Sequence, residues 1–108
     1  MYVTLFYATG PGWLPDTPVF GQSRAAMRAL AGHRDYLQKL LEAGKLVIGG
    51  PYTNGTGGMA LFEVESEQEA ETILANDPAI ISGVFVGERR QWVPEFSRGF
   101  DLSAEPSP

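Results

Sequence analysis

Apolar and polar positions alternate along four short segments of the chain, a pattern typical of β-strands. These segments are residues 2–8, 45–51, 58–65 and 83–93. In the first segment Val3, Leu5 and Tyr7 point to one side. The opposite side carries Tyr2 and Phe6 and is also largely apolar, which predicts a central strand covered on both faces.

Two other segments have the spacing of amphipathic helices. The first, residues 23–43, begins with a serine suited to the N-cap, places Leu30 and Leu37 on one face, and ends before Gly44. Gly32 interrupts this helix, and we expect either a kink or the close approach of another backbone there. The second helix, residues 67–75, follows a capping box in which a glutamate should reach back to the amide of Ser66.

The connections between these elements differ in length and composition. Residues 10–22 are rich in proline and glycine yet contain Trp13 and Phe20, so they predict either a lid over a binding site or a loop packed on a sheet edge. Residues 79–82 predict a short turn before the last strand. We assign residues 1–94 to one domain and expect the tail, residues 95–108, to be weakly ordered.

The order of these elements is βαββαβ, which predicts an α+β, ferredoxin-like fold with a four-stranded antiparallel sheet. Right-handed crossovers place both helices on one face of the sheet. The other face would then be left bare and apolar, because the first strand is apolar on both sides and the third carries Met59 and Leu61 on its second side. Packing two sheets face to face would cover it, so we predict a homodimer.

Composition excludes several classes of site. The chain has no cysteine and one histidine, which rules out disulfides, thiol nucleophiles and zinc sites built on several histidines of one chain. A net charge of −5 without a basic run argues against nucleic-acid binding. We expect no membrane span, no cofactor and no bound metal, and the N-terminus lacks a basic leader, which predicts a cytoplasmic protein.

The candidate chemistry rests on His33 and Asp77. His33 lies on the apolar stripe of the first helix, where a lone histidine is more typical of a satisfied core residue than of a catalyst. Asp77 precedes a proline and could cap the next helical turn, but it also lies four residues after Ile73 on the inward side. The packing of the two helices could therefore bring the carboxylate to the imidazole, whose tautomer it would set.

Two groups of residues resemble the signatures of the YciI-like, YCII-related family. The first group is His33-Arg34-Asp35-Tyr36-Leu37, Leu40, Gly44-Lys45-Leu46 and Gly49-Gly50-Pro51; the second is Asn76-Asp77-Pro78 and Gly83-Val84-Phe85. The resemblance implies a dimeric α+β barrel with a catalytic pair at His33 and Asp77. It also implies elimination, such as dehydrochlorination, or isomerisation of a small cyclic or aromatic molecule.

Candidate ligand-binding residues surround this predicted pair. Tyr7 and Ser82 should lie near it in the inferred fold, and Gly50 and Pro51 could let a ligand approach a strand end, although a tight turn explains them as well. Two rival interpretations stay open. One is a ligand-binding or regulatory homodimer with a structural histidine–aspartate pair, and the other is a cofactor-free monooxygenase of the same fold.

Overall fold

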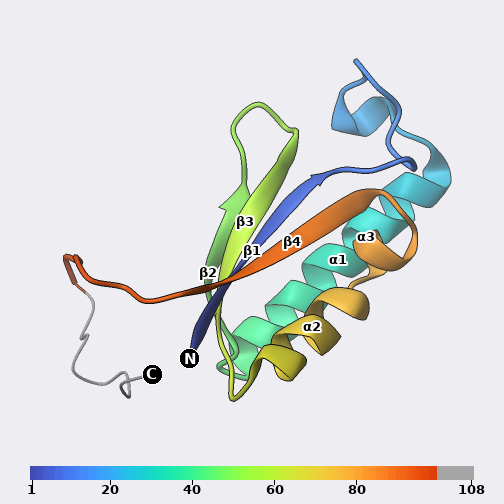
Figure 1. The fold of residues 1–108 in the computed structure, drawn as a ribbon. Coiled ribbons are helices and arrows are strands. Elements are labelled where there is room, and N and C mark those ends of the chain that lie inside the picture. Colours follow the sequence, from blue (N-terminus) through green and yellow to red (C-terminus); the bar gives the residue numbers. More distant parts are fainter. Residues whose placement is uncertain (100–108) are drawn as a thin grey trace.

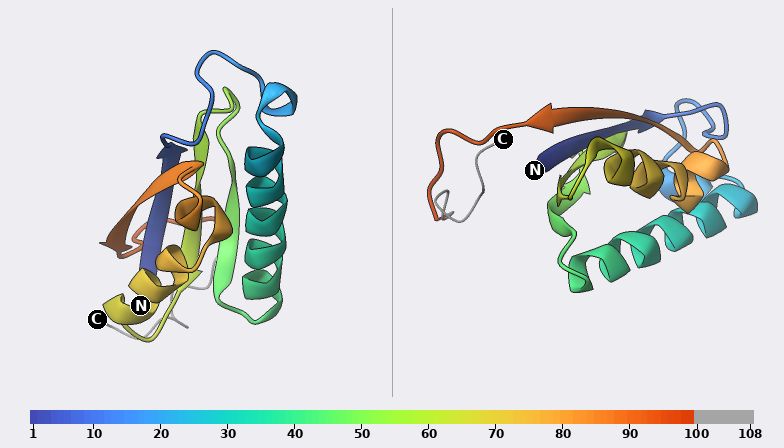
Figure 2. Two further views of the ribbon diagram at one scale, coloured as in Figure 1. Left: turned by 90° about the vertical axis from the view of Figure 1, so that its right-hand side faces the viewer. Right: turned by 60° about the horizontal axis from the view of Figure 1, so that its bottom comes forward.

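The computed structural model describes residues 1–99, which form a four-stranded antiparallel sheet with its helices on one face (Figure 1 and Figure 2). In chain order the elements are β1 (Tyr2–Thr9), the 3-10 helix η1 (Val19–Gly21), α1 (Arg24–Glu42), β2 (Leu46–Pro51), β3 (Gly57–Glu63), α2 (Glu67–Ala75), α3 (Pro78–Ile81) and β4 (Phe85–Trp92). The strand order β2-β3-β1-β4 confirms the predicted ferredoxin-like arrangement.

The core lies between the sheet and the helices. On β1, Val3 and Leu5 are fully buried, and Tyr7 is 4% exposed on the same face. Their partners across the β1–β3 ladder include Phe62, opposite Val3, and Ala60, opposite Leu5. These side chains form one apolar cluster. The alternation along β1 groups these three residues on one side as predicted, and the structure shows that this side packs on the helices.

The helix ends follow from local side-chain chemistry. Ser23 caps α1, and Gly44 adopts a φ of 79° just after that helix, a conformation that glycine adopts without strain. Ser66 accepts a hydrogen bond from the amide of Glu69 and so caps α2. The Glu69 carboxylate accepts a hydrogen bond from the amide of Glu65. The predicted donor was the amide of Ser66, one residue later.

One element was predicted wrongly. Residues 79–82, expected to be a turn, belong mostly to the short helix α3. Asp77 caps it, because its Oδ1 accepts a hydrogen bond of 2.9 Å from the amide of Ala79. Four residues are too few for a hydrophobic period to be visible, so only the Asp-Pro start signals this helix.

The 10–22 loop is packed onto the connection between α3 and β4. The amides of Gly10 and Gly12 each donate a 2.8 Å hydrogen bond to carbonyl groups of that connection. Further along, the buried amide side chain of Gln22 bonds to both the amide and the carbonyl of Leu14. The start of the loop thus corresponds to the packed interpretation, and the opening of the loop as a lid stays a prediction.

Three further features concern the C-terminal residues, the length of the helices and the distribution of basic side chains. Residues 94–99 continue beyond β4 (Figure 1), where Pro94, Phe96, Ser97 and Arg98 help to line a cavity on the open face of the sheet. The rest of the predicted tail lies outside the described residues. None of the helices within residues 1–99 is long and apolar enough to cross a membrane.

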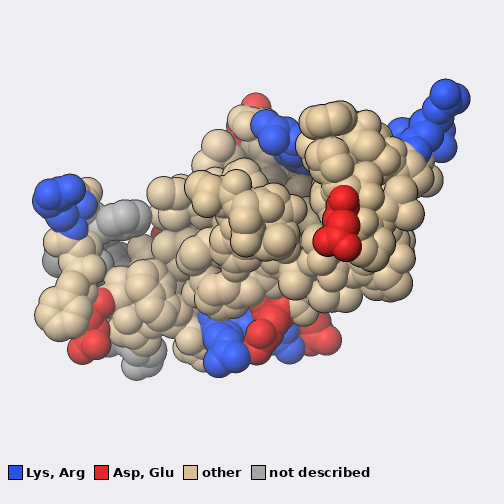
Figure 3. All heavy atoms as spheres, turned by 90° about the horizontal axis from the view of Figure 1, so that it is seen from above, with Lys and Arg blue, Asp and Glu red and all other residues tan. Residues whose placement is uncertain are grey.

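On the face shown in Figure 3, Lys and Arg side chains of the described residues do not form a continuous basic surface.

Candidate active site

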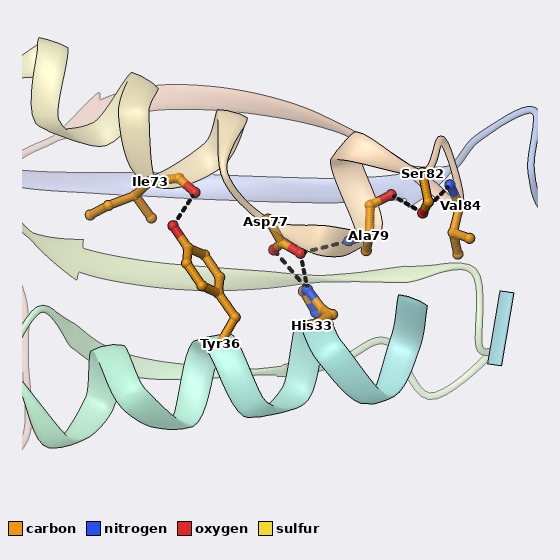
Figure 4. A network of polar contacts seen from close by, with 7 residues as sticks. All are labelled: His33, Tyr36, Ile73, Asp77, Ala79, Ser82 and Val84. Carbon is orange, nitrogen blue, oxygen red and sulfur yellow. Dashed lines mark hydrogen bonds and ion pairs between the residues drawn. The ribbon is translucent and has the colours of Figure 1, made fainter. Parts of the chain in front are cut away.

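His33 and Asp77 are joined by a hydrogen bond between α1 and the start of α3 (Figure 4). The Nδ1 atom of His33 lies 2.7 Å from Oδ2 and 2.9 Å from Oδ1 of Asp77. A carboxylate can only accept hydrogen bonds, so Nδ1 carries the proton and donates it toward Asp77. The other ring nitrogen, Nε2, makes no hydrogen bond to the described residues and is left available as an acceptor.

Burial distinguishes the two partners. The Asp77 side chain has no exposed surface, whereas 12% of the His33 side chain is exposed. The Asp77 carboxylate serves both His33 and the amide of Ala79. Asp77 therefore both caps α3 and pairs with His33. Because only the imidazole is partly exposed, a molecule arriving from solvent meets it before the carboxylate.

A glycine lets the two helices approach closely enough for this contact. A Cβ atom added at Gly32 would lie 3.2 Å and 3.3 Å from two ring carbons of Pro78. Gly32 immediately precedes His33, and Pro78 immediately follows Asp77. A close approach does occur at Gly32, but the neighbour is a proline side chain and not the backbone that was predicted.

Replacing Gly32 by valine should separate α1 from α3. The branched side chain cannot fit beside Pro78, and overpacking of this kind costs about 1–3 kcal/mol. Denaturant unfolding should show that loss, and the NMR signals of the His33 ring should shift as the Asp77 contact lengthens. Ala31→Val at the exposed neighbouring position is the control for the valine's helix propensity. Unchanged His33 signals in Gly32→Val would contradict this role for the glycine.

An aromatic cluster surrounds the imidazole. The ring centroids of Tyr7 and Phe85 lie 5.2 Å and 5.5 Å from that of His33, both in edge-to-face geometry. Trp13 stacks on Phe85 with the ring centroids 6.2 Å apart. The sequence did not reveal Phe85 as a neighbour of the imidazole, because the alternation of its strand predicts only that this side chain is buried. Trp13 was noted as a loop anchor, but its partner could not be inferred.

Two tyrosines, Tyr7 and Tyr36, lie close enough to Asp77 to respond to its charge. Tyr36, one turn after His33 on α1, donates a 2.7 Å hydrogen bond to the carbonyl of Ile73. Burial first, and then the charge of Asp77, raises the pKa of Tyr36. Burial, the charge of Asp77 and a hydrogen-bonding contact with the Asp77 carboxylate raise the pKa of Tyr7 far above its usual value. Both phenols therefore stay protonated at neutral pH.

The predicted ligand-binding residues are only partly brought together. Tyr7 contacts the His33 ring. Ser82 ends α3, where its hydroxyl donates to the carbonyl of Ala79 and accepts from the amide of Val84 (Figure 4). Gly50 and Pro51 lie on β2, which β3 separates from β1. The roles of these four residues in ligand binding stay predictions.

A cavity opens on the side of the sheet opposite the His33–Asp77 pair. A volume of about 500 Å³ opens on the face away from the helices, and its lining includes Tyr2, Thr4, Phe6, Met59 and Leu61. The His33–Asp77 pair is on the helix side and does not line this cavity. Within residues 1–99 no cluster of three or more potential metal-ligating side chains is found.

The sequence profile of the YCII-related domain matches residues 1–92, nearly the whole described chain. The chain belongs to the YCII-related family. It is 33% identical over 63 residues to the uncharacterised protein YjpA of Bacillus subtilis (strain 168), an alignment that covers 58% of this chain and 74% of that protein.

Two solved structures share the fold of this YCII-related protein. The 5-chloro-2-hydroxyhydroquinone dehydrochlorinase TftG of Burkholderia phenoliruptrix AC1100, in complex with 2,5-dihydroxybenzoquinone, superimposes with a TM-score of 0.59 and 20% identity over 85% of this chain and 93% of that chain. Muconolactone isomerase superimposes with a TM-score of 0.69 and 16% identity over 94% of this chain and 97% of that chain. At these identities the likeness concerns the fold alone, a four-stranded antiparallel sheet with its helices on one face.

Proposed function

We propose that this protein is a cofactor-independent enzyme in which the His33–Asp77 pair moves a proton on a small cyclic or aromatic molecule. The observation that carries the proposal is the bond from Nδ1 of His33 to buried Asp77, which leaves Nε2 without a partner among the described residues. Asp77 holds the ring in one tautomer and orientation, so Nε2 can act as a general base.

The pair supports two related reactions. In an elimination, Nε2 takes a proton from a ring carbon, the electrons of that C–H bond form a double bond, and the leaving group departs with its bonding electrons. In an isomerisation, the imidazolium returns the proton to a different carbon. The names of the two fold relatives, a dehydrochlorinase and an isomerase, support these two classes.

The test is a direct assay of the purified protein. Chloride release from 5-chloro-2-hydroxyhydroquinone and isomerisation of muconolactone, each followed by NMR, cover both classes. We expect turnover of at least one such cyclic compound above the rate without protein. If neither these compounds nor 2,5-dihydroxybenzoquinone reacts or perturbs the His33 ring signals at millimolar concentration, the pair is structural.

We also propose that two copies pack through the open sheet face. Ile48 and Met59 on that face are 61% and 44% exposed, and Trp92 on β4 is 47% exposed. Stable interfaces bury about 800 Å² per partner, and an apolar sheet face is suited to this. The dimeric barrel fold of the superfamily supports the same arrangement.

Met59→Glu should abolish this dimer. A carboxylate buried between two sheets without a partner would cost more than ~3 kcal/mol, which weakens association by more than about 100-fold. Sedimentation equilibrium at micromolar concentration should give a dimer for the wild type and a monomer for the variant. Leu41→Glu, at a position of matched 45% exposure on α1, is the control and should stay dimeric. A monomeric wild type would refute the proposal.

A further inference from the structure

The apolar side chains of the 10–22 loop contribute little to holding it in place. The loop lies at the end of the sheet where β4 begins (Figure 1). Leu14, Val19 and Phe20 are 47%, 49% and 82% exposed, whereas Trp13 is partly buried. The position of this loop therefore depends on Trp13 and on the hydrogen bonds of the loop.

Gln22, at the end of the loop, makes three of these hydrogen bonds with one side chain. Its Oε1 atom accepts a 2.7 Å bond from the amide of Leu14, and its Nε2 atom donates to the carbonyls of Leu14 and Thr17 at 3.0 Å and 3.1 Å. The residue is 7% exposed, so these bonds are shielded from water. Gln22 thus ties the end of the loop to the residue that follows Trp13.

The backbone before Trp13 is attached separately. The amide of Gly12 donates a 2.8 Å hydrogen bond to the carbonyl of Gly83, and the amide of Gly10 donates a bond of the same length to the carbonyl of Val84. A Cβ atom added at Gly10 would lie 2.4 Å from the Gly83 oxygen, so the two backbones are in direct contact there. The chain is therefore held on both sides of Trp13, by the glycines before it and by Gln22 after it.

Trp13 is connected to the imidazole through Phe85. The Trp13 and Phe85 rings are stacked with an interplanar angle of 23°, and Phe85 meets His33 edge-to-face with ring centroids 5.5 Å apart. Phe85 is 9% exposed. Of these three rings only that of Trp13 belongs to the loop, so a movement of the loop would uncover Phe85 and free it to move off the imidazole.

We propose that Gln22 is a positioning residue that latches the loop, keeps Trp13 stacked on Phe85 and so limits how far a molecule from solvent can reach the His33 ring. This deepens the proposed function and rests on it for the use of the site in catalysis. A loop with exposed apolar side chains gains little from burial, so its closed and open arrangements differ by a small free energy. The three bonds of Gln22 are large enough to decide between them.

The lone histidine makes access to the site measurable in the whole protein. Diethyl pyrocarbonate acylates an unprotonated imidazole nitrogen, which in His33 is Nε2, and the ultraviolet absorbance of the product gives the rate. Gln22→Ala should raise this rate about tenfold or more, because loop opening no longer breaks the three bonds. Gln22→Glu keeps the size of the side chain but has no donor at neutral pH, so it should act in the same way.

Asn54→Ala is the matched control for loss of an amide side chain that holds a turn. The Asn54 side-chain oxygen accepts hydrogen bonds from the amide and the hydroxyl of Thr56, between β2 and β3. This variant should react at the wild-type rate. An unchanged rate in both Gln22 variants, or an equal increase in Asn54→Ala, would overturn the proposal.

A double-mutant cycle tests whether Gln22 acts through Trp13. Trp13→Ala should itself raise the reactivity of His33, and the further change Gln22→Ala should then add little, because the ring that the latch positions is already gone. If the two effects multiply instead, Gln22 does not act through Trp13 and the proposal fails.

The fluorescence of Trp13 reports on the loop directly. The chain has two tryptophans, so Trp92→Phe leaves Trp13 as the only one. In this background Gln22→Ala should increase the quenching of Trp13 by acrylamide, while Asn54→Ala should leave it unchanged. Equal quenching with and without the Gln22 side chain would contradict the latch.

These readouts separate the latch from the proposed function, because none of them requires turnover. A protein that turns over no cyclic compound but whose His33 becomes more reactive in Gln22→Ala still has the latch. Conversely, turnover that depends on His33, together with unchanged reactivity in Gln22→Ala, leaves the enzyme proposal standing and removes only the role of Gln22.

Discussion

Replacing Asp77 by alanine should lower the free energy of unfolding by about 3 kcal/mol, a large part of the stability of a domain this small. The substitution removes the cap of α3, because the amide of Ala79 loses its acceptor. It also removes the acceptor of the His33 Nδ1–H, which is then left without a partner in the protein interior. The two losses occur at one fully buried carboxylate.

Ser66→Ala is the matched control for this prediction. Ser66 is exposed and caps α2 through the amide of Glu69, so its removal should cost about 1 kcal/mol and report on capping alone. Chemical denaturation of both variants and of the wild type gives the three free energies. The excess loss in Asp77→Ala measures the buried pair. An Asp77→Ala loss no greater than that of Ser66→Ala would show that the contact with His33 contributes nothing to folding.

His33→Gln should reduce kcat/KM by about 10²–10⁴-fold on whichever cyclic substrate is turned over. Glutamine can still donate a hydrogen bond to Asp77, so the fold and the capping of α3 should persist, but its amide cannot take up a proton as Nε2 does. Arg34→Gln, at the exposed neighbouring position on α1, controls for the change of residue and should keep full activity. Activity that survives in His33→Gln would exclude the imidazole as the general base.

The Asp77→Asn variant tests the orientation of the His33 ring separately from the capping of α3. Its side-chain oxygen can still accept from the amide of Ala79, so α3 should remain capped. The neutral amide binds the imidazole more weakly than a carboxylate does. We therefore expect a smaller stability loss than in Asp77→Ala, together with a clear fall in kcat/KM.

The elements with a clear repeating pattern could be predicted from the sequence. The alternation on β1 grouped Val3 and Leu5 on one side of the strand, and the helical spacing after Ser23 identified α1. These patterns are local, because each depends on a residue's position within its own strand or helix. The α3 helix was predicted as a turn, since one helical turn cannot show a period.

The sequence by itself determined the ferredoxin-like order of strands and helices and the identity of the lone histidine, because these depend on local spacing and on composition. Only the tertiary structure decided that Asp77, 44 residues from His33, meets its ring while capping α3, and that Tyr7 and Phe85 contact that ring edge-to-face. Such contacts depend on how closely two helices pack. Here that distance is set by the fit of Pro78 against Gly32, which no periodicity in either helix reveals.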